Sequence, residues 1–152
     1  MKIAIGSDHG GYVLKGKLIN FLKDGKYVVE DFGSHSKDAC DYPQIGFEVA
    51  RAVSEGRAER GVLICRTGIG MAIIANKLPG VRAGACYDEK MARSSREHND
   101  TNVLVLAADY TPEAEAKKMT KIWLTTKALG DRHARRVKQI EELELKNRKR
   151  SA

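Results

Sequence analysis

Residues 61–70 read GVLICRTGIG, an apolar run of strand type that leads directly into a glycine-rich turn. Similar runs of β-branched and aliphatic residues recur along the chain. Several are apolar on both faces, as are the strands of a parallel sheet that helices cover on both sides. The predicted strands are residues 2–5, 27–32, 61–65, 81–86 and 103–107.

Amphipathic stretches with helical periodicity separate these runs. They cover residues 12–23, 44–55, 71–77, 88–97 and 113–129, and a last helix is expected at about residues 132–150. Thr111 precedes Pro112 and Glu113, which is typical of a helix start with a hydroxyl cap. The alternation predicts an α/β fold in one domain, residues 1–152: a Rossmann-like, doubly wound, three-layer αβα sandwich of about five parallel strands with a basic C-terminal helix appended.

The composition is that of a globular protein. Of 152 residues, 42% are hydrophobic and 31% are charged, which excludes a disordered or fibrous chain. No apolar run approaches the roughly 18–20 residues that a bilayer helix needs, and the opening MKIAIGSDHGG is no signal peptide, so we expect a cytoplasmic protein. Cys40, Cys65 and Cys86 are odd in number and contain no C-x-x-C pair, which argues against a disulfide framework and a zinc ribbon.

Most of the positive charge lies at the C-terminus. The chain has 27 Lys and Arg against 20 Asp and Glu, a net charge of +7, and residues 132–152 contribute eight basic residues and three glutamates, or +5. A nucleic-acid binder is therefore an alternative, although Trp123 is the only aromatic residue after Tyr110 and no stacking residues accompany the charge. For residues 146–150 a solvated helix end is the simpler interpretation.

The loops after the predicted strands hold the candidate chemistry, because doubly wound sheets bind ligands at the carboxyl ends of their strands. Gly68 and Gly70 are followed by Ile73 where a dinucleotide fingerprint needs a third glycine, and no P-loop occurs. The turn from Thr67 to Gly70 still offers backbone N–H groups to an anion. A flavodoxin-like nucleotide-binding module is thus a further alternative.

Two of these loops carry reactive side chains. Cys65 directly precedes the glycine-rich turn, a position that favours the thiolate, whereas we expect Cys40 and Cys86 to be structural or incidental. Asp8 and His9 put two titratable groups into a glycine-flanked loop, where they have little packing purpose.

Two further groups lie near predicted helix ends. His98 either satisfies terminal carbonyls or takes part in a site. Arg132 and Arg136 stand four residues apart, so they can share one helix face and clamp a phosphate.

Six motifs follow one another over most of the chain: GSDHGG at 6–11, DYP at 41–43, CxTGxG at 65–70, ANKLPGVRA at 75–83, MARxSREHND at 91–100 and GxRHxxRV at 130–137. Together they resemble the family of type B ribose-5-phosphate isomerases and their galactose-6-phosphate isomerase relatives. That family interconverts an aldose phosphate and its ketose through an enediolate. The resemblance implies a phosphorylated sugar as substrate, most simply ribose 5-phosphate, with no cofactor, no metal, and neither nucleic acid nor membrane as partner.

The resemblance also implies catalytic roles. Cys65 would be the base that moves the proton between C1 and C2, and Thr67 would stabilise the enediolate. The backbone N–H groups of the turn at 66–70 would assist it, those of Gly68, Ile69 and Gly70 included. His98, with Asp8 nearby, would open the sugar ring.

The implied substrate-binding residues come from distant parts of the sequence. They are Tyr42 in the pocket, Arg66 beside the turn, Asn99 on the sugar hydroxyls, and His9, Arg132 and Arg136 on the phosphate. The family's site lies between two subunits, which implies a homodimer or a dimer of dimers.

Several positions depart from the family's pattern. Arg66 and Asp131 stand where relatives usually have glycine, and Asp109 stands where many have a phosphate-binding arginine. Met71 occupies the position of the glutamate that replaces the cysteine in some relatives, which groups this chain with the cysteine users. Arg66 attracts a phosphate and Asp109 repels it, so the substrate can differ from that of the relatives. Allose 6-phosphate, galactose 6-phosphate, and a tetrose or other pentose phosphate are the alternative substrates.

Overall fold

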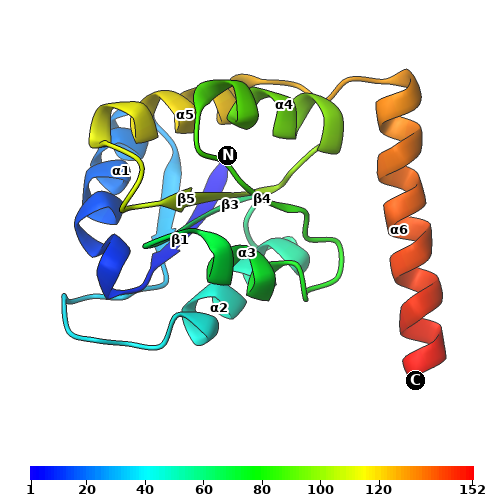
Figure 1. The fold of residues 1–152 in the computed structure, drawn as a ribbon, viewed down its shortest axis with the longest axis horizontal. Helices are drawn as coiled ribbons and strands as arrows, with labels where there is room; N and C mark the ends of the chain where they lie inside the picture. The colour runs from blue at the N-terminus through cyan, green and yellow to red at the C-terminus, as the bar shows by residue number, and fades with distance from the viewer.

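Five parallel strands form one sheet in the order β2-β1-β3-β5-β4 (Figure 1). The computed structural model describes residues 1–152. The strands are β1 (Lys2–Ser7), β2 (Val28–Asp31), β3 (Arg60–Cys65), β4 (Ala83–Ala85) and β5 (Val103–Ala107). The five predicted strands are confirmed, although β4 is only three residues long.

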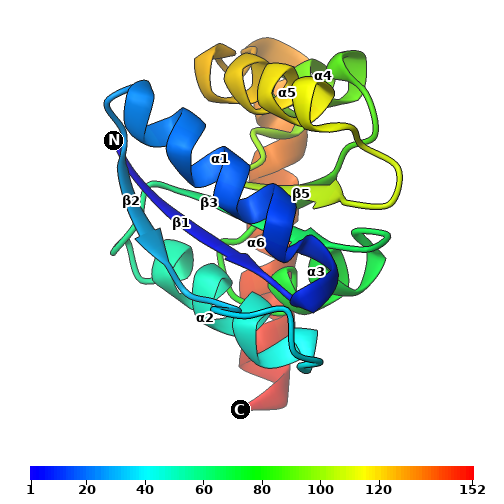
Figure 2. The same cartoon turned by 90° about the vertical axis from the view of Figure 1, so that its left-hand side faces the viewer.

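Helices cover both faces of this sheet (Figure 2). One face packs against α1 (Tyr12–Asp24), α4 (Glu89–Asn99) and α5 (Glu113–Thr125), and the other against α2 (Tyr42–Ser54) and α3 (Ile69–Ala75). A 3-10 turn, η1 (His9–Gly11), leads from β1 into α1. The predicted doubly wound, three-layer αβα sandwich is therefore confirmed.

Two apolar clusters, one on each face of the sheet, form the core. Ile3 and Ile5 contribute to the cluster under α1, α4 and α5, and Ala4 between them contributes to the cluster under α2 and α3, because successive strand residues point to opposite faces. Every residue of β5 is buried, as its uninterrupted apolar run predicted. The buried Trp123 donates its indole N–H to the Thr101 hydroxyl at 2.9 Å, so its polar atom is also satisfied.

Two helix starts and one helix cap differ from the prediction. α2 begins at Tyr42 because Pro43 fits the first turn of a helix. α3 begins at Ile69 instead of residue 71, since Gly68 completes the turn in a left-handed conformation with φ of 78°. The predicted hydroxyl cap of α5 was wrong: Pro112 is the N-cap, and the buried Thr111 hydroxyl, one residue further out, makes no hydrogen bond.

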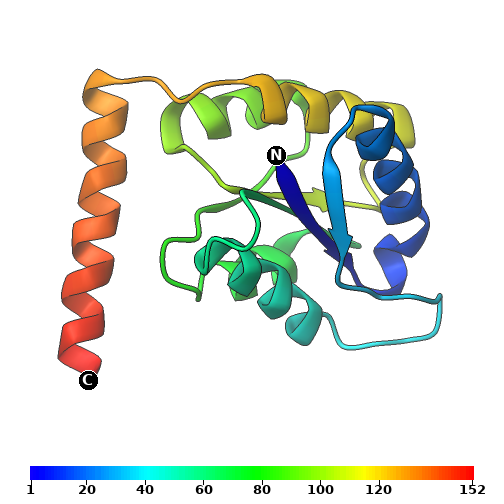
Figure 3. The same cartoon turned by 180° about the vertical axis from the view of Figure 1, so that it is seen from behind.

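The C-terminal helix α6 (Asp131–Ser151) stands apart from the three layers (Figure 3) and has no buried residue. Glu141 on this helix pairs with Arg82 at 3.2 Å, and the Glu144 carboxylate accepts the Gly80 N–H at 3.0 Å. Asp131 has φ of 50°, a left-handed conformation that glycine adopts freely and aspartate tolerates. None of the helices, α6 included, is both long and apolar enough to cross a membrane.

Candidate active site

The loops after β1 and β3 lie at the carboxyl ends of the strands and lead to opposite faces of the sheet. These strands are neighbours, but the helices that follow them, α1 and α3, cover opposite faces. Such a topological switch point forms the ligand crevice of open α/β sheets. The two loops that the sequence indicated, residues 8–11 and 66–68, are therefore side by side.

Cys65 ends β3 at this edge, with 5% of the residue exposed. The Gly68 N–H donates a hydrogen bond to Sγ at 3.2 Å. An N–H donor favours the thiolate over the thiol, because it interacts more strongly with the charged form. The Cys86 thiol acts instead as a donor, to the Gly84 carbonyl, and burial raises its pKa.

Thr67 occupies the turn between Cys65 and α3. Its hydroxyl oxygen accepts the Ile69 N–H at 3.3 Å, and its carbonyl accepts the Tyr87 hydroxyl at 3.0 Å. The N–H groups of Thr67 and Gly70 have no acceptor within the chain, so the turn holds donors for an anion. Tyr87 was not among the predicted site residues, although its place in the loop after β4 was a usable signal.

Asp8 and His9 lie in the neighbouring loop after β1. Asp8 is buried, and its Oδ1 accepts the Gly11 N–H at 3.1 Å, which fixes the loop. His9 Nδ1 accepts the Cys40 N–H at 3.3 Å. A neutral His9 with this bond carries its proton on Nε2, so it presents an N–H donor.

Tyr42 borders the turn from the side of α2. A Cβ atom on Gly70 would lie 2.6 Å from Tyr42 Cζ, so the ring rests directly against this glycine. Ile69 beside it is 57% exposed. The predicted residues Tyr42, Gly68, Ile69 and Gly70 are thus brought together with Cys65.

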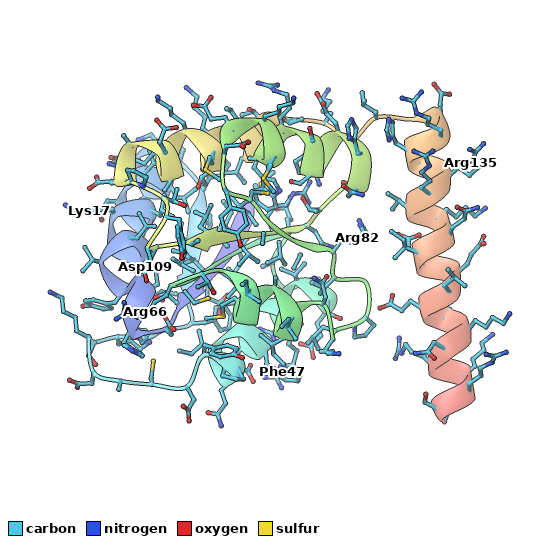
Figure 4. All side chains as sticks on the ribbon, in the orientation of Figure 1. Lys17, Phe47, Arg66, Arg82, Asp109 and Arg135 are labelled. Carbon is cyan, nitrogen blue, oxygen red and sulfur yellow. The ribbon has the colours of Figure 1, made fainter.

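His98 and Asn99 lie at the opposite end of the strands from Cys65, where the strands begin. They end α4, which starts beyond the carboxyl end of β4 and leads back to the beginning of β5. Figure 4 shows the same separation, with Arg66 and Asp109 at one end of the molecule and Arg135 of α6 at the other. The expectation that Asp8 lies near His98 is therefore not met within one chain.

The start of α6 joins His98 in a second, positively charged cluster. The His98 and His133 rings stack with centroids 4.3 Å apart. Partial burial lowers the pKa of His133, and the neighbouring His98, Arg132 and Arg136 lower it further, whereas Glu97 opposes this shift. Arg132 and Arg136 are exposed on α6, so this cluster is suited to binding an anion.

Arg66 and Asp109 form an ion pair at the Cys65 edge. Arg66 Nη1 lies 3.5 Å from Asp109 Oδ1, and the Asp109 N–H donates to the Arg66 carbonyl at 3.1 Å. The two departures from the family's pattern therefore face each other. Any repulsion of a phosphate by Asp109 is offset by the charge of Arg66 close by.

No group of three or more His, Cys, Asp or Glu side chains is arranged to hold a metal ion. Met71 is the third residue of α3 and is fully buried against α2, where a Cβ on Gly46 would lie 2.9 Å from its Sδ. It has no titratable group, so Cys65 is the candidate base in this crevice.

Comparison with known proteins identifies the family of this chain. The profile of the Ribose/Galactose Isomerase family matches residues 3–140. Ribose-5-phosphate isomerase B of Escherichia coli is 41% identical over 143 residues, 94% of this chain and 96% of the relative. The solved ribose-5-phosphate isomerase B of Clostridium thermocellum has a TM-score of 0.94 and 49% identity over 97% of this chain and 99% of that one. That of Mycoplasma genitalium, solved with bound ribulose-5-phosphate, has a TM-score of 0.91 and 37% identity over 94% and 95%.

The fold and these similarities define an aldose-ketose isomerase that acts on a phosphorylated sugar. The chain belongs to the Ribose/Galactose Isomerase family.

Proposed function

We propose that the enzyme interconverts ribose 5-phosphate and ribulose 5-phosphate through a cis-enediolate, with Cys65 as the base. The observation that carries this proposal is the hydrogen bond from the Gly68 N–H to Cys65 Sγ, in a turn whose Thr67 and Gly70 N–H groups are unoccupied. A base for a proton beside a carbonyl must be poised near neutrality. The developing oxyanion needs preorganised donors within reach of the same base, and this turn supplies them.

The proton transfer runs between adjacent carbons of the open-chain sugar. The Cys65 thiolate takes the proton from C2 of the aldose, and the electrons of that bond form the C1–C2 double bond of the enediolate. The thiol then returns the proton to C1. The hydroxyl proton on O2 passes to O1 in the enediolate stage, so O1 ends as a hydroxyl and C2–O2 becomes the carbonyl of the ketose. The Thr67 hydroxyl and the unoccupied N–H groups of Thr67 and Gly70 stabilise the charge on the oxygens, while the Gly68 N–H stays on Cys65 Sγ and Ile69 completes the turn. Tyr42 borders the space for the sugar.

A complete site requires residues from both ends of the molecule, and we assign them to two subunits of a homodimer or a dimer of dimers. One subunit supplies Cys65, Thr67, Asp8 and His9. The other supplies the second cluster, namely His98, Asn99, Arg132 and Arg136. The helix α6, which has no buried residue, and the exposed side chains of Ile69 and Ile73 on α3 support such an assembly.

Within this assembly the second cluster meets the open end of the crevice. His98 of the second subunit opens the furanose ring with Asp8 of the first, and Asn99 binds sugar hydroxyls. Arg132 and Arg136 hold the phosphate as bidentate guanidinium ligands, and His9 adds its Nε2–H.

Substitution of the three cysteines tests the assignment of the base. We expect Cys65→Ala to abolish isomerisation of ribose 5-phosphate while the substrate still binds, and Cys40→Ala and Cys86→Ala to keep most of the activity. Activity should also survive exhaustive chelation, because the enediolate is assigned to backbone donors. Retained turnover in Cys65→Ala would exclude this base, and activity lost to chelator and restored by a divalent ion would exclude the metal-free mechanism.

Co-expression of two inactive variants tests the shared site. Cys65→Ala and His98→Asn, each with its own tag, should be far less active alone than the heterodimer purified over both tags. One of its two sites contains both intact residues, so about half of the wild-type activity per dimer is expected. A heterodimer no more active than the two variants would place both residues in the same subunit's site.

A second substrate of the same family is favoured by one observation, the Arg66–Asp109 ion pair at the crevice. The family's pattern lacks this pair of charges, so allose 6-phosphate, galactose 6-phosphate, and a tetrose or other pentose phosphate are the candidates to compare with ribose 5-phosphate. A screen of kcat/KM over these sugars ranks them directly.

A further inference from the structure

The loops around Cys65 contain one basic residue that the proton transfer does not use. The segments after β1, β3, β4 and β5, which are residues 8–11, 66–68, 86–88 and 108–112, include Arg66 but no other Lys or Arg. The same segments contain three carboxylates, Asp8, Asp88 and Asp109. A phosphate at this edge therefore meets more negative than positive charge from the subunit itself, and the position of Arg66 becomes decisive.

The backbone of Arg66 is fixed by the loop after β5. The Ala108 N–H donates to the Cys65 carbonyl at 2.8 Å, and the Asp109 N–H donates to the Arg66 carbonyl at 3.1 Å. These bonds extend the β3–β5 ladder beyond the ends of the strands. The Cα atom of Arg66 is thus held beside the base and opposite Asp109.

The side chain of Arg66 lies across the loop after β1. A Cβ atom on Gly10 would lie 2.6 Å from Arg66 Cγ, 3.3 Å from its Nε and 3.3 Å from Asp8 Oδ1. Gly10 therefore leaves the room that the arginine occupies. The arginine therefore lies over the loop that contains Asp8 and His9, at the same end of the molecule as Asp109 (Figure 4).

The guanidinium is held loosely. Its one contact with an opposite charge is the 3.5 Å approach to Asp109, and the two side chains are 62% and 46% exposed. Charge-assisted N–H···O bonds are shorter, about 2.7–2.9 Å, and exposed pairs contribute little to stability. Arg82 and Arg96, in contrast, donate several hydrogen bonds each within the chain. Arg66 thus has donors available for a ligand.

We propose that Arg66 is the charged phosphate ligand that the Cys65 subunit supplies beside His9, and that Asp109 is a positioning residue, which holds the guanidinium at the crevice and competes with the phosphate for it. This inference rests on the proposed function for the identity of the substrate. A phosphate dianion carries more charge than the carboxylate and offers a bidentate geometry, so the substrate displaces Asp109 from Arg66. Arg132 and Arg136 of the other subunit then hold the same phosphate from outside.

The variants Arg66→Gln, Asp109→Asn and the double variant test this assignment. Arg66→Gln should raise KM for ribose 5-phosphate, and Kd for inorganic phosphate in calorimetry, by about ten- to a hundredfold, the effect of a lost charged hydrogen bond, with kcat nearly unchanged. Asp109→Asn should lower both constants by about two- to fivefold. In the double variant, both constants should stay close to those of Arg66→Gln.

Arg57→Gln is the matched control. Arg57 also forms an exposed ion pair, with Glu55 at 2.8 Å. It lies in the loop before β3, at the opposite end of this strand from Cys65. Arg57→Gln should leave KM and Kd unchanged. If Arg66→Gln also leaves both constants unchanged, or lowers only kcat, the assignment is overturned. Calorimetry with inorganic phosphate needs no turnover, so it decides the role of Arg66 independently of the reaction. Wild-type protein that isomerises no sugar phosphate would refute the proposed function alone.

Discussion

Gly68→Ala separates the fold of the Cys65 turn from its chemistry. Gly68 has φ of 78°, and a Cβ there would lie 3.4 Å from Val105 Cγ1, an ordinary van der Waals contact. The substitution is therefore strained by its backbone conformation and not by lack of space. A left-handed non-glycine residue costs about 1–2 kcal/mol of unfolding free energy, which a domain of this size tolerates.

The effect on catalysis should be larger than the effect on stability. If the strained turn relaxes, the Gly68 N–H moves away from Cys65 Sγ, with which it forms the 3.2 Å hydrogen bond. A hydrogen bond to a charged group contributes about 1.5–3 kcal/mol. We therefore expect kcat for ribose 5-phosphate to fall roughly ten- to a hundredfold, with KM little changed.

Gly56→Ala provides the control, since Gly56 has φ of 71° and a Cβ there would meet no atom within 4 Å. It lies in the turn between α2 and β3, away from the crevice. Urea unfolding followed by circular dichroism should give similar losses of stability for both variants, and only Gly68→Ala should lose kcat. Equal kcat in the two variants would refute the claim that the Gly68 N–H activates Cys65.

Three further outcomes follow from single contacts. Lys15 is 2% exposed and donates to both oxygens of Asp31, so Lys15→Met should lower the unfolding free energy by about 3 kcal/mol; a loss below about 1 kcal/mol in urea would contradict this. Tyr87→Phe removes the hydroxyl that donates a hydrogen bond to the Thr67 carbonyl and should lower kcat about fivefold. Its urea midpoint should change no more than that of Gly56→Ala. The pKa of His133 is lowered in the folded protein, so a detached α6 binds the proton more readily. The docking of α6 should therefore be complete above the ordinary histidine pKa of about 6.5 and weaken as the pH falls below it. Hydrogen exchange of residues 131–151 measures this, and protection independent of pH between 5 and 8 would argue against it.

Local sequence determined the layers and the reactive loop. The buried β5 follows from an uninterrupted apolar run, and the break between strand and helix at 65–70 follows from its glycines, because burial on both faces and left-handed φ values restrict the residue types that fit. Cys65, Thr67 and the glycines belong to one contiguous segment, so their proximity needed no tertiary information. The cap of α5 was missed, although its first residue was not, because a threonine cap at residue 111 and a proline cap at residue 112 are compatible with the same sequence.

Only the tertiary structure decided how the distant groups are distributed. The motif at 91–100 gives no sign that His98 lies at the opposite edge from Asp8, because that depends on α4 running back to the start of β5. The pairing of Arg66 with Asp109 likewise depends on β3 and β5 being neighbours, although β4 lies between them in the sequence. Periodicity and spacing report on contacts within one helix or strand, whereas contacts between loops are fixed by strand order and by the face that each connecting helix covers.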